Sequence, residues 1–122
     1  MPDRDVVTTF VSLVESGQFI EAIQRFYHPA AIVRENQEKS RMGIDALVEN
    51  ESLVLRTFTT VHGRALHVMV DGDNVAINWH FEFSNRGTRL SLDEIAYQQW
   101  SDGKIAHEHF YYDPSQLRPA GR

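Results

Sequence analysis

Two glutamates stand where a carboxyl group could exchange protons with a small molecule. Glu35 ends the apolar run 31–33, and Glu108 lies between Ala106 and Phe110 at the period of two that a β-strand imposes. Apolar surroundings disfavour an ionised carboxylate, so its pKa rises toward the range useful for general acid–base catalysis. Glu108 and Glu35 are therefore the candidate catalytic residues. The alternative for Glu35 is a solvent-exposed glutamate at the end of a strand.

The expected last strand, Ile105 to Tyr112, can turn either of two faces inward. One face carries Glu108 together with Ala106, Phe110 and Tyr112. The other face carries two histidines and consists of Ile105, His107, His109 and Tyr111. A slip of one residue moves every side chain to the opposite face. The period alone leaves both registers open, and in the second one Glu108 is in solvent.

His107 and His109 lie two residues apart, so on a strand they point the same way. Together with Asp113 they could begin a metal site, but further ligands would have to converge from other strands. His80 belongs to the strand after next, about 10 Å away by strand spacing. We therefore predict no metal. These histidines are expected on the outer face of the sheet, at a contact between two copies of the chain.

Composition excludes several classes of function. The 122 residues contain no cysteine, which excludes thiolate chemistry, and a net charge of −5 disfavours nucleic acid as a partner. No phosphate loop, nucleotide fingerprint or serine elbow is present, so no cofactor is expected. No apolar run approaches the roughly 20 residues of a membrane span, and the first residues do not resemble a signal peptide. A cytoplasmic protein without a membrane partner is predicted.

The elements that must position the two glutamates form a helical block and a strand block. Apolar spacing predicts a helix over residues 6–14 that ends at Gly17, and a second helix over 19–27 that Pro29 ends. A short strand over 30–35 and a polar loop over 36–41 follow. A third helix is expected to begin near Gly43.

Four strands then follow one another through short turns. They are expected over residues 66–70, 74–83, 89–100 and 105–112, with turns at 71–74, 85–87 and 101–104. Strands joined by such turns must pair antiparallel as a meander. Helices followed by strands predict a single α+β domain over residues 1–122.

Aromatic residues alternate without interruption in the second of these strands. Trp79, Phe81 and Phe83 share one face with Val75 and Ile77, which predicts that all of them are buried. Replacing Phe81 by alanine would then cost about 3–5 kcal/mol. Aromatic walls are also typical of ligand cavities.

Several segments together resemble the SnoaL-like polyketide cyclase family, within the nuclear transport factor 2-like superfamily that includes the ketosteroid isomerases. They are Phe10 to Phe26 leading into residues 27–33, then Met42-Gly43-Ile44, and then Asp102-Gly103-Lys104-Ile105 leading to Glu108 and residues 111–114. The resemblance covers nearly the whole chain. It implies a cone-shaped fold in which three N-terminal helices pack on a strongly curved antiparallel sheet. It also implies an apolar pocket inside the cone and a homodimer formed through the outer sheet face.

The same resemblance implies roles for individual residues. Glu35 matches the general base of the ketosteroid isomerases, and Glu108 matches a catalytic acid that SnoaL-type cyclases keep on the last strands. The register that this implies turns Glu108 toward the pocket. The expected ligand-binding residues are Trp79, Phe81, Gln98, Phe110, Tyr112 and Phe10. The isomerases' tyrosine and second acid match Phe10 and Ala96, neither of which donates a hydrogen bond, so a classical ketosteroid isomerase is rejected.

These inferences favour a small-molecule pocket protein. As an enzyme it would be a cofactor-free cyclase or isomerase that transfers protons on an apolar or cyclic substrate. The alternatives are a ligand-binding module without catalysis and an interaction domain that uses the outer sheet face. An enzyme is expected to hold a carboxyl group with a strongly raised pKa, whereas an interaction domain is expected to expose an apolar patch.

Overall fold

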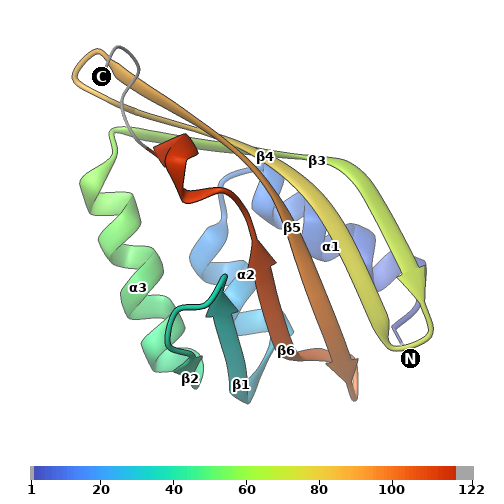
Figure 1. The fold of residues 1–122 in the computed structure, drawn as a ribbon. Coiled ribbons are helices and arrows are strands. Elements are labelled where there is room, and N and C mark those ends of the chain that lie inside the picture. The colour runs from blue at the N-terminus through green and yellow to red at the C-terminus, as the bar shows by residue number, and fades with distance from the viewer. Residues whose placement is uncertain (1, 118–122) are drawn as a thin grey trace.

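The computed structural model describes residues 2–117, in which three helices pack on one face of a curved six-stranded sheet (Figure 1). The helices are α1 (Arg4–Glu15), α2 (Phe19–Phe26) and α3 (Ile44–Thr57). The strands are β1 (Tyr27–Glu35), β2 (Arg41–Met42), β3 (Thr60–Asp71), β4 (Asn74–Asn85), β5 (Thr88–Ser101) and β6 (Lys104–Tyr111), and a 3-10 helix η1 (Pro114–Leu117) follows. The predicted α+β class is confirmed. Within residues 2–117, no helix combines the length and the apolar character needed to cross a membrane.

The first two helices begin and end at local signals in the sequence. The Asp3 side chain accepts a hydrogen bond from the Val6 amide at 3.0 Å and caps α1. Gly17, with a φ of 83°, ends the turn after α1 as predicted. Pro29, however, does not end α2. Tyr27 is already extended, so the helix stops at Phe26 and Pro29 lies inside β1.

The sheet has the strand order β2-β1-β6-β5-β4-β3. Strands β3 to β6 form the predicted antiparallel meander. The expectation of a wholly antiparallel sheet is wrong in one place, because β1 pairs with β6 in parallel. No short turn joins these two strands, since α3 and the meander lie between them in the chain. The first strand therefore lies beside the last one, and the open sheet ends at β2 on one side and at β3 on the other.

An irregularity in β6 decides which residues of this strand face inward. Gln99 pairs with His107, but the next residue of β5, Trp100, pairs with Ile105. Ala106 is thus the extra residue of a β-bulge, which changes the alternation of the strand. As a result Ile105 and Glu108 are both buried, although strict alternation would place them on opposite faces.

The core lies between the helices and the face of the sheet that they cover. It is formed mainly by apolar side chains from α1, α2, β4 and β5, namely Val7, Phe10, Val11, Phe26, Val75, Ile77, Trp79, Ala96 and Trp100. Trp79 is buried as predicted, but Phe81 and Phe83 are only half-buried. Both rings are only half-buried because one side of each ring faces a cavity and is not packed against other side chains. Gly63 on β3 faces Phe81 so closely that a Cβ atom there would lie 2.4 Å from the ring.

A carboxyl-rich cavity as the candidate active site

A cavity of about 350 Å³ lies between the helices and the covered face of the sheet. Its walls are largely aromatic and aliphatic, and the three helices, all six strands and η1 contribute to them. The apolar residues that line the cavity include Phe10, Val14, Phe19, Leu47, Val54, Trp79, Phe81, Phe83, Leu92 and Phe110. Eight polar residues interrupt these walls: Tyr27, Glu35, Arg41, Asn50, Glu51, Glu94, Glu108 and Tyr112. An apolar cavity with a few convergent polar groups is the usual form of a small-molecule site.

Glu108 lies in the cavity wall with only 4% of its surface exposed. Its carboxyl group accepts two hydrogen bonds, one at each oxygen. The Tyr27 hydroxyl donates to Oε1, and the Gln98 amide donates to Oε2 at 2.6 Å. Burial raises the pKa of Glu108 to about 7, although both hydrogen bonds act to lower it. The group can therefore both accept and donate a proton near neutral pH.

Behind Glu108 the chain is tightly packed. Gln98 is fully buried and accepts a hydrogen bond from the Trp100 indole N–H at 3.0 Å. The Trp100 ring is packed edge-on against Phe10 and Phe26, with ring centroids 6.2 Å and 6.3 Å away. Gln98 was expected to present its amide to a ligand, but it does not line the cavity. Its amide instead contacts the carboxyl group that does.

Glu35 forms a second polar cluster in a more exposed part of the cavity wall. Arg41 Nη1 lies 2.7 Å from Glu35 Oε2, and the Tyr112 hydroxyl donates to Oε1 at 2.6 Å. The side chains of Glu35 and Arg41 are 24% and 29% exposed. Burial and the contact with Glu35 raise the pKa of Tyr112, so its hydroxyl remains a donor. The structure thus brings both predicted glutamates into one cavity, each with a tyrosine beside it.

Two further glutamates, Glu94 and Glu51, line the cavity, and the sequence analysis did not select them. Glu94 is 8% exposed, and burial, followed by the nearby charge of Glu108, raises its pKa to about 8. Its side chain forms no hydrogen bond within the described residues 2–117. Glu51 lies on α3, and burial, followed by the charge of Glu35, raises its pKa as well. Glu94 is therefore protonated at neutral pH and has a free donor directed at the cavity.

Sequence signals for these missed residues existed. Glu94 alternates with Ala96 and Gln98, both of which were placed on the pocket face. Glu51 follows Leu47 by four residues and so shares its face of α3. Tyr27 gave no such signal, because it was assigned to a helix. In the structure it is the first residue of β1, and burial raises its pKa well above the ordinary value, which keeps it a donor.

Strand register places the three strand-borne carboxyl groups at successive levels of the cavity. Glu108 is opposite Gln98, whereas Glu35 is opposite Phe110, which in turn is opposite Ala96. Glu94 lies two residues further along β5, so its Cα is about 13 Å from the level of Glu108. Glu108 and Glu94, whose pKa values are about 7 and about 8, therefore lie at opposite ends of this row. A ligand of several rings could contact both.

The remaining predicted ligand-binding residues are all found at the cavity. Phe10, Trp79, Phe81, Phe110 and Tyr112 line it. Arg34 does not line the cavity and donates a hydrogen bond to the Glu38 carbonyl at 2.9 Å.

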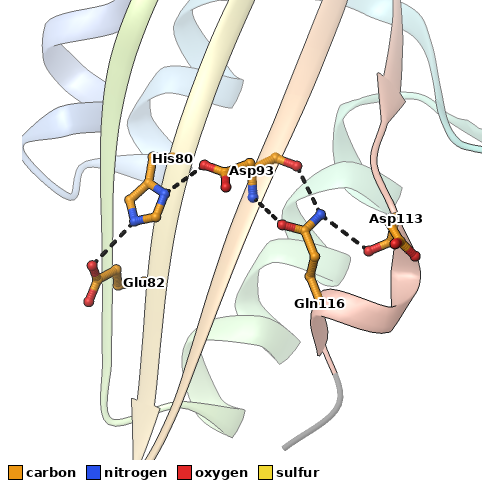
Figure 2. Close-up of polar contacts among 5 residues, drawn as sticks. All are labelled: His80, Glu82, Asp93, Asp113 and Gln116. Atoms are coloured by element: carbon orange, nitrogen blue, oxygen red, sulfur yellow. Dashed lines mark hydrogen bonds and ion pairs between the residues drawn. The ribbon is translucent and has the colours of Figure 1, made fainter. Parts of the chain in front are cut away.

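The histidines lie on the other face of the sheet. His80 contacts Asp93 at 2.8 Å and Glu82 at 3.2 Å, and the hydrogen bond to Asp93 is the main reason that its pKa is raised (Figure 2). The side-chain amide of Gln116 bonds the backbone N–H and carbonyl of Asp93, which attaches η1 to the edge of β5. His109 bonds the Asn36 carbonyl at 2.8 Å. Among residues 2–117, no cluster of three or more acidic or histidine side chains is arranged to hold a metal ion.

The family of SnoaL-like domains matches residues 7–108, and the chain belongs to it. Among solved structures, the chain is similar to a putative SnoaL-like polyketide cyclase from Jannaschia sp. CCS1, with 14% identity over 92% of this chain and 88% of that one and a TM-score of 0.79. It is also similar to a putative SnoaL-like polyketide cyclase from Mesorhizobium loti, with 22% identity over 92% and 100% of the two chains and a TM-score of 0.76. A third is TerC co-crystallized with polyporic acid, with 18% identity over 91% of each chain and a TM-score of 0.78. At these identities the likeness shows the fold. No curated protein matches the chain.

Proposed function

We propose that this protein is a cofactor-free enzyme that moves protons on a neutral, ring-containing small molecule, as a cyclase or an isomerase does. The observation that carries the proposal is the buried Glu108 carboxyl group in the wall of an apolar cavity, with a pKa of about 7. A general base works best when its pKa is near the working pH, because the ionised form is then populated and still accepts a proton. Both proton-transferring groups belong to the chain, so the proposal requires no cofactor.

The proposed mechanism divides the work between two glutamates. Ionised Glu108 removes a proton from a carbon next to a carbonyl group of the substrate. Protonated Glu94, whose side chain has no hydrogen bond to the rest of residues 2–117, lies at the other end of the row. It donates a proton to a second substrate oxygen that is conjugated with that carbon through the rings, and so stabilises the negative charge that develops there. The aromatic walls exclude water and so strengthen both interactions.

The charges of the cavity support a neutral substrate. Four carboxyl groups line the walls, and the only cationic side chain among the lining residues, Arg41, is paired with Glu35. An anionic substrate would therefore meet no free cation there. The volume of about 350 Å³ suits a molecule of two or three rings. The co-crystallization of TerC with polyporic acid supports the expectation that this fold can hold an organic ligand.

The experiment that tests this proposal is hydrogen–deuterium exchange into β-tetralone, a bicyclic ketone, followed by NMR. Wild-type protein is expected to accelerate exchange, with a rate that rises with pH through about 7 as Glu108 ionises. Glu108→Gln is expected to reduce the rate about 100-fold, since it removes the base and keeps the shape. Binding of the ketone without any exchange would instead support the ligand-binding module. A Glu108 carboxyl group that titrates near pH 4.5 would refute the catalytic proposal.

A second proposal concerns the outer face of the sheet, where exposed apolar side chains favour an interface between two copies of the chain. Ile95, Tyr97 and Tyr111 are each about two-fifths to one-half exposed, and the Tyr111 ring stacks on His109 at 4.0 Å. We propose a homodimer through this face, which also carries Asn78, His80 and His107. Sedimentation equilibrium is expected to show a dimer at micromolar concentration, and Tyr97→Glu is expected to shift it to the monomer. A wild-type monomer at high micromolar concentration would refute the dimer.

A further inference from the structure

A chain of two hydrogen bonds runs through the protein directly behind Glu108. The Trp100 indole N–H donates to Gln98 Oε1 at 3.0 Å, and Gln98 Nε2 donates to Glu108 Oε2 at 2.6 Å. Gln98 is 0% exposed and Trp100 is 3% exposed, and neither lines the cavity. A ligand in the cavity therefore contacts neither residue. Their influence on it passes through Glu108.

We propose that Trp100 and Gln98 are positioning residues for Glu108: the indole N–H selects the orientation of the Gln98 amide that presents a donor to the carboxyl group. This inference rests on the proposed role of Glu108 in proton transfer. It adds Trp100 and Gln98 to the site, although neither residue lines the cavity.

The selection follows from the chemistry of the three groups. A glutamine amide has a donor end and an acceptor end of nearly equal shape, so packing alone allows either orientation. The indole nitrogen is only a donor. If the Gln98 amide were reversed, its NH₂ group would face the Trp100 N–H and its oxygen would face Glu108 Oε2. With Glu108 ionised, both contacts would then be repulsive, and the indole N–H and the carboxylate would lose their partners.

The backbone and the neighbouring rings hold this arrangement in place. Gln98 and Glu108 are directly opposite each other in the β5–β6 pairing, and the bulge at Ala106 places the buried Ile105 opposite Trp100. Phe10 and Phe26 pack edge-on against the indole ring, with centroids 6.2 Å and 6.3 Å away. Rings packed in this way fix the direction of the indole N–H.

The orientation of the amide matters for the ionised form of Glu108. Burial disfavours the carboxylate, whereas the hydrogen bonds from Gln98 and Tyr27 favour it and lower its pKa. Without the donor from Gln98, Glu108 would be protonated over more of the neutral range. At a pH below the midpoint, each unit of increase in its pKa would reduce the ionised fraction about tenfold. The chain from Trp100 thus keeps the base available.

The test is an NMR titration of Glu108 in ¹³C-labelled protein without any ligand. Trp100→Phe is expected to raise the midpoint of Glu108 by about one pH unit, and Gln98→Met by at least as much. The double variant is expected to match Gln98→Met alone, because Trp100 acts only through Gln98. Val7→Ala is the matched control. It removes packing from the buried core on α1, outside the cavity lining, and no hydrogen bond, so it is expected to lower stability and leave the midpoint unchanged.

Benzothienylalanine incorporated at Trp100 provides a second variant that keeps the ring shape and lacks the N–H, and it is expected to give the same shift as Trp100→Phe. An unchanged midpoint in both proteins would overturn the proposal. Equal shifts from Trp100→Phe in the wild-type and Gln98→Met backgrounds would also overturn it. Because no substrate is present, the titration is independent of the exchange experiment. Failure of the proposed function and failure of this inference can therefore be told apart.

Discussion

Two glutamates of the same cavity have different surroundings. Each accepts a hydrogen bond from a tyrosine, Glu108 from Tyr27 and Glu35 from Tyr112. The second partner of Glu108 is the neutral amide of Gln98, whereas the second partner of Glu35 is the guanidinium group of Arg41. Glu108 is almost fully buried, while the Glu35 side chain is about one-quarter exposed.

The partner therefore determines what each carboxyl group can do. A neutral donor stabilises the ionised carboxylate less than a cation does, so burial prevails at Glu108 and its pKa rises to about 7. At Glu35 the guanidinium group supplies a full opposite charge at 2.7 Å. Glu108 is thus suited to exchange protons, and Glu35 is suited to hold Arg41 and Tyr112 in place. The predictions below test this distinction.

The largest expected effect is a loss of stability as the pH rises. Glu108 and Glu94 have raised pKa values of about 7 and about 8 in the folded protein. The folded state therefore binds more protons than the unfolded state, and the free energy of unfolding falls as the pH rises from about 5 to about 9. The expected fall is on the order of 6 kcal/mol, measured by urea denaturation.

The matching control is the same titration in a Glu94→Gln, Glu108→Gln double variant, whose stability is expected to change much less with pH. His80 also has a raised pKa, and it contributes in the same direction. It is therefore replaced by glutamine in every protein compared. A double variant with the wild-type pH dependence would show that these carboxyl groups are not the cause.

A smaller effect is expected from removing the two tyrosine hydroxyls one at a time. At about pH 8.5, where Glu108 is largely ionised, Tyr27→Phe is expected to cost about 1–3 kcal/mol, because a buried charge loses a donor. Tyr112→Phe is expected to cost less than about 1 kcal/mol, because Arg41 still pairs with Glu35 and water reaches the site. Urea denaturation measures both. The opposite order would contradict the distinction between the two clusters.

The smallest effect is expected at the ion pair itself. Arg41→Met is expected to cost about 0.5 kcal/mol at low ionic strength, and this cost should shrink in about 1 M salt because the pair is partly exposed. Gln98→Met removes no charge, so its cost should not depend on salt. Urea denaturation of both variants at the two salt concentrations gives the comparison. A salt-independent cost for Arg41→Met would indicate that packing, and not charge, holds this cluster.

The sequence predicted most of the fold because its signals are local. Turn residues at 71–74, 85–87 and 101–104 fix the meander, and apolar spacing fixes the helices. The pairing of β1 with β6 was not predicted as parallel, since it depends on contacts between residues far apart in the chain. Pro29 misled the prediction because a proline is also compatible with an irregular part of a strand, and the pairing of β1 with β6 shifts register between Tyr27 and Ile32.

The site was predicted less completely, for reasons that particular residues make clear. The sequence left two registers open for the last strand, and the bulge at Ala106 explains why, since it buries Ile105 from one set and Glu108 from the other. The contact of Gln98 with Glu108 depends on the register between two strands, which alternation within one strand does not give. The resemblance to the isomerases directed attention to Ala96. The acid of this strand is two residues away, at Glu94.

The parallel pairing of β1 with β6 has a consequence for protein synthesis. Tyr27 and Glu108, which meet inside the cavity, are 81 positions apart in the chain. The hairpins of β3 to β5 can form as soon as their own residues leave the ribosome, because their contacts are local. Strand β1 has to wait for β6, and until then the apolar surface that will line the cavity faces water or a chaperone. A nascent chain of this protein therefore completes its cavity only after residues through Leu117 have emerged.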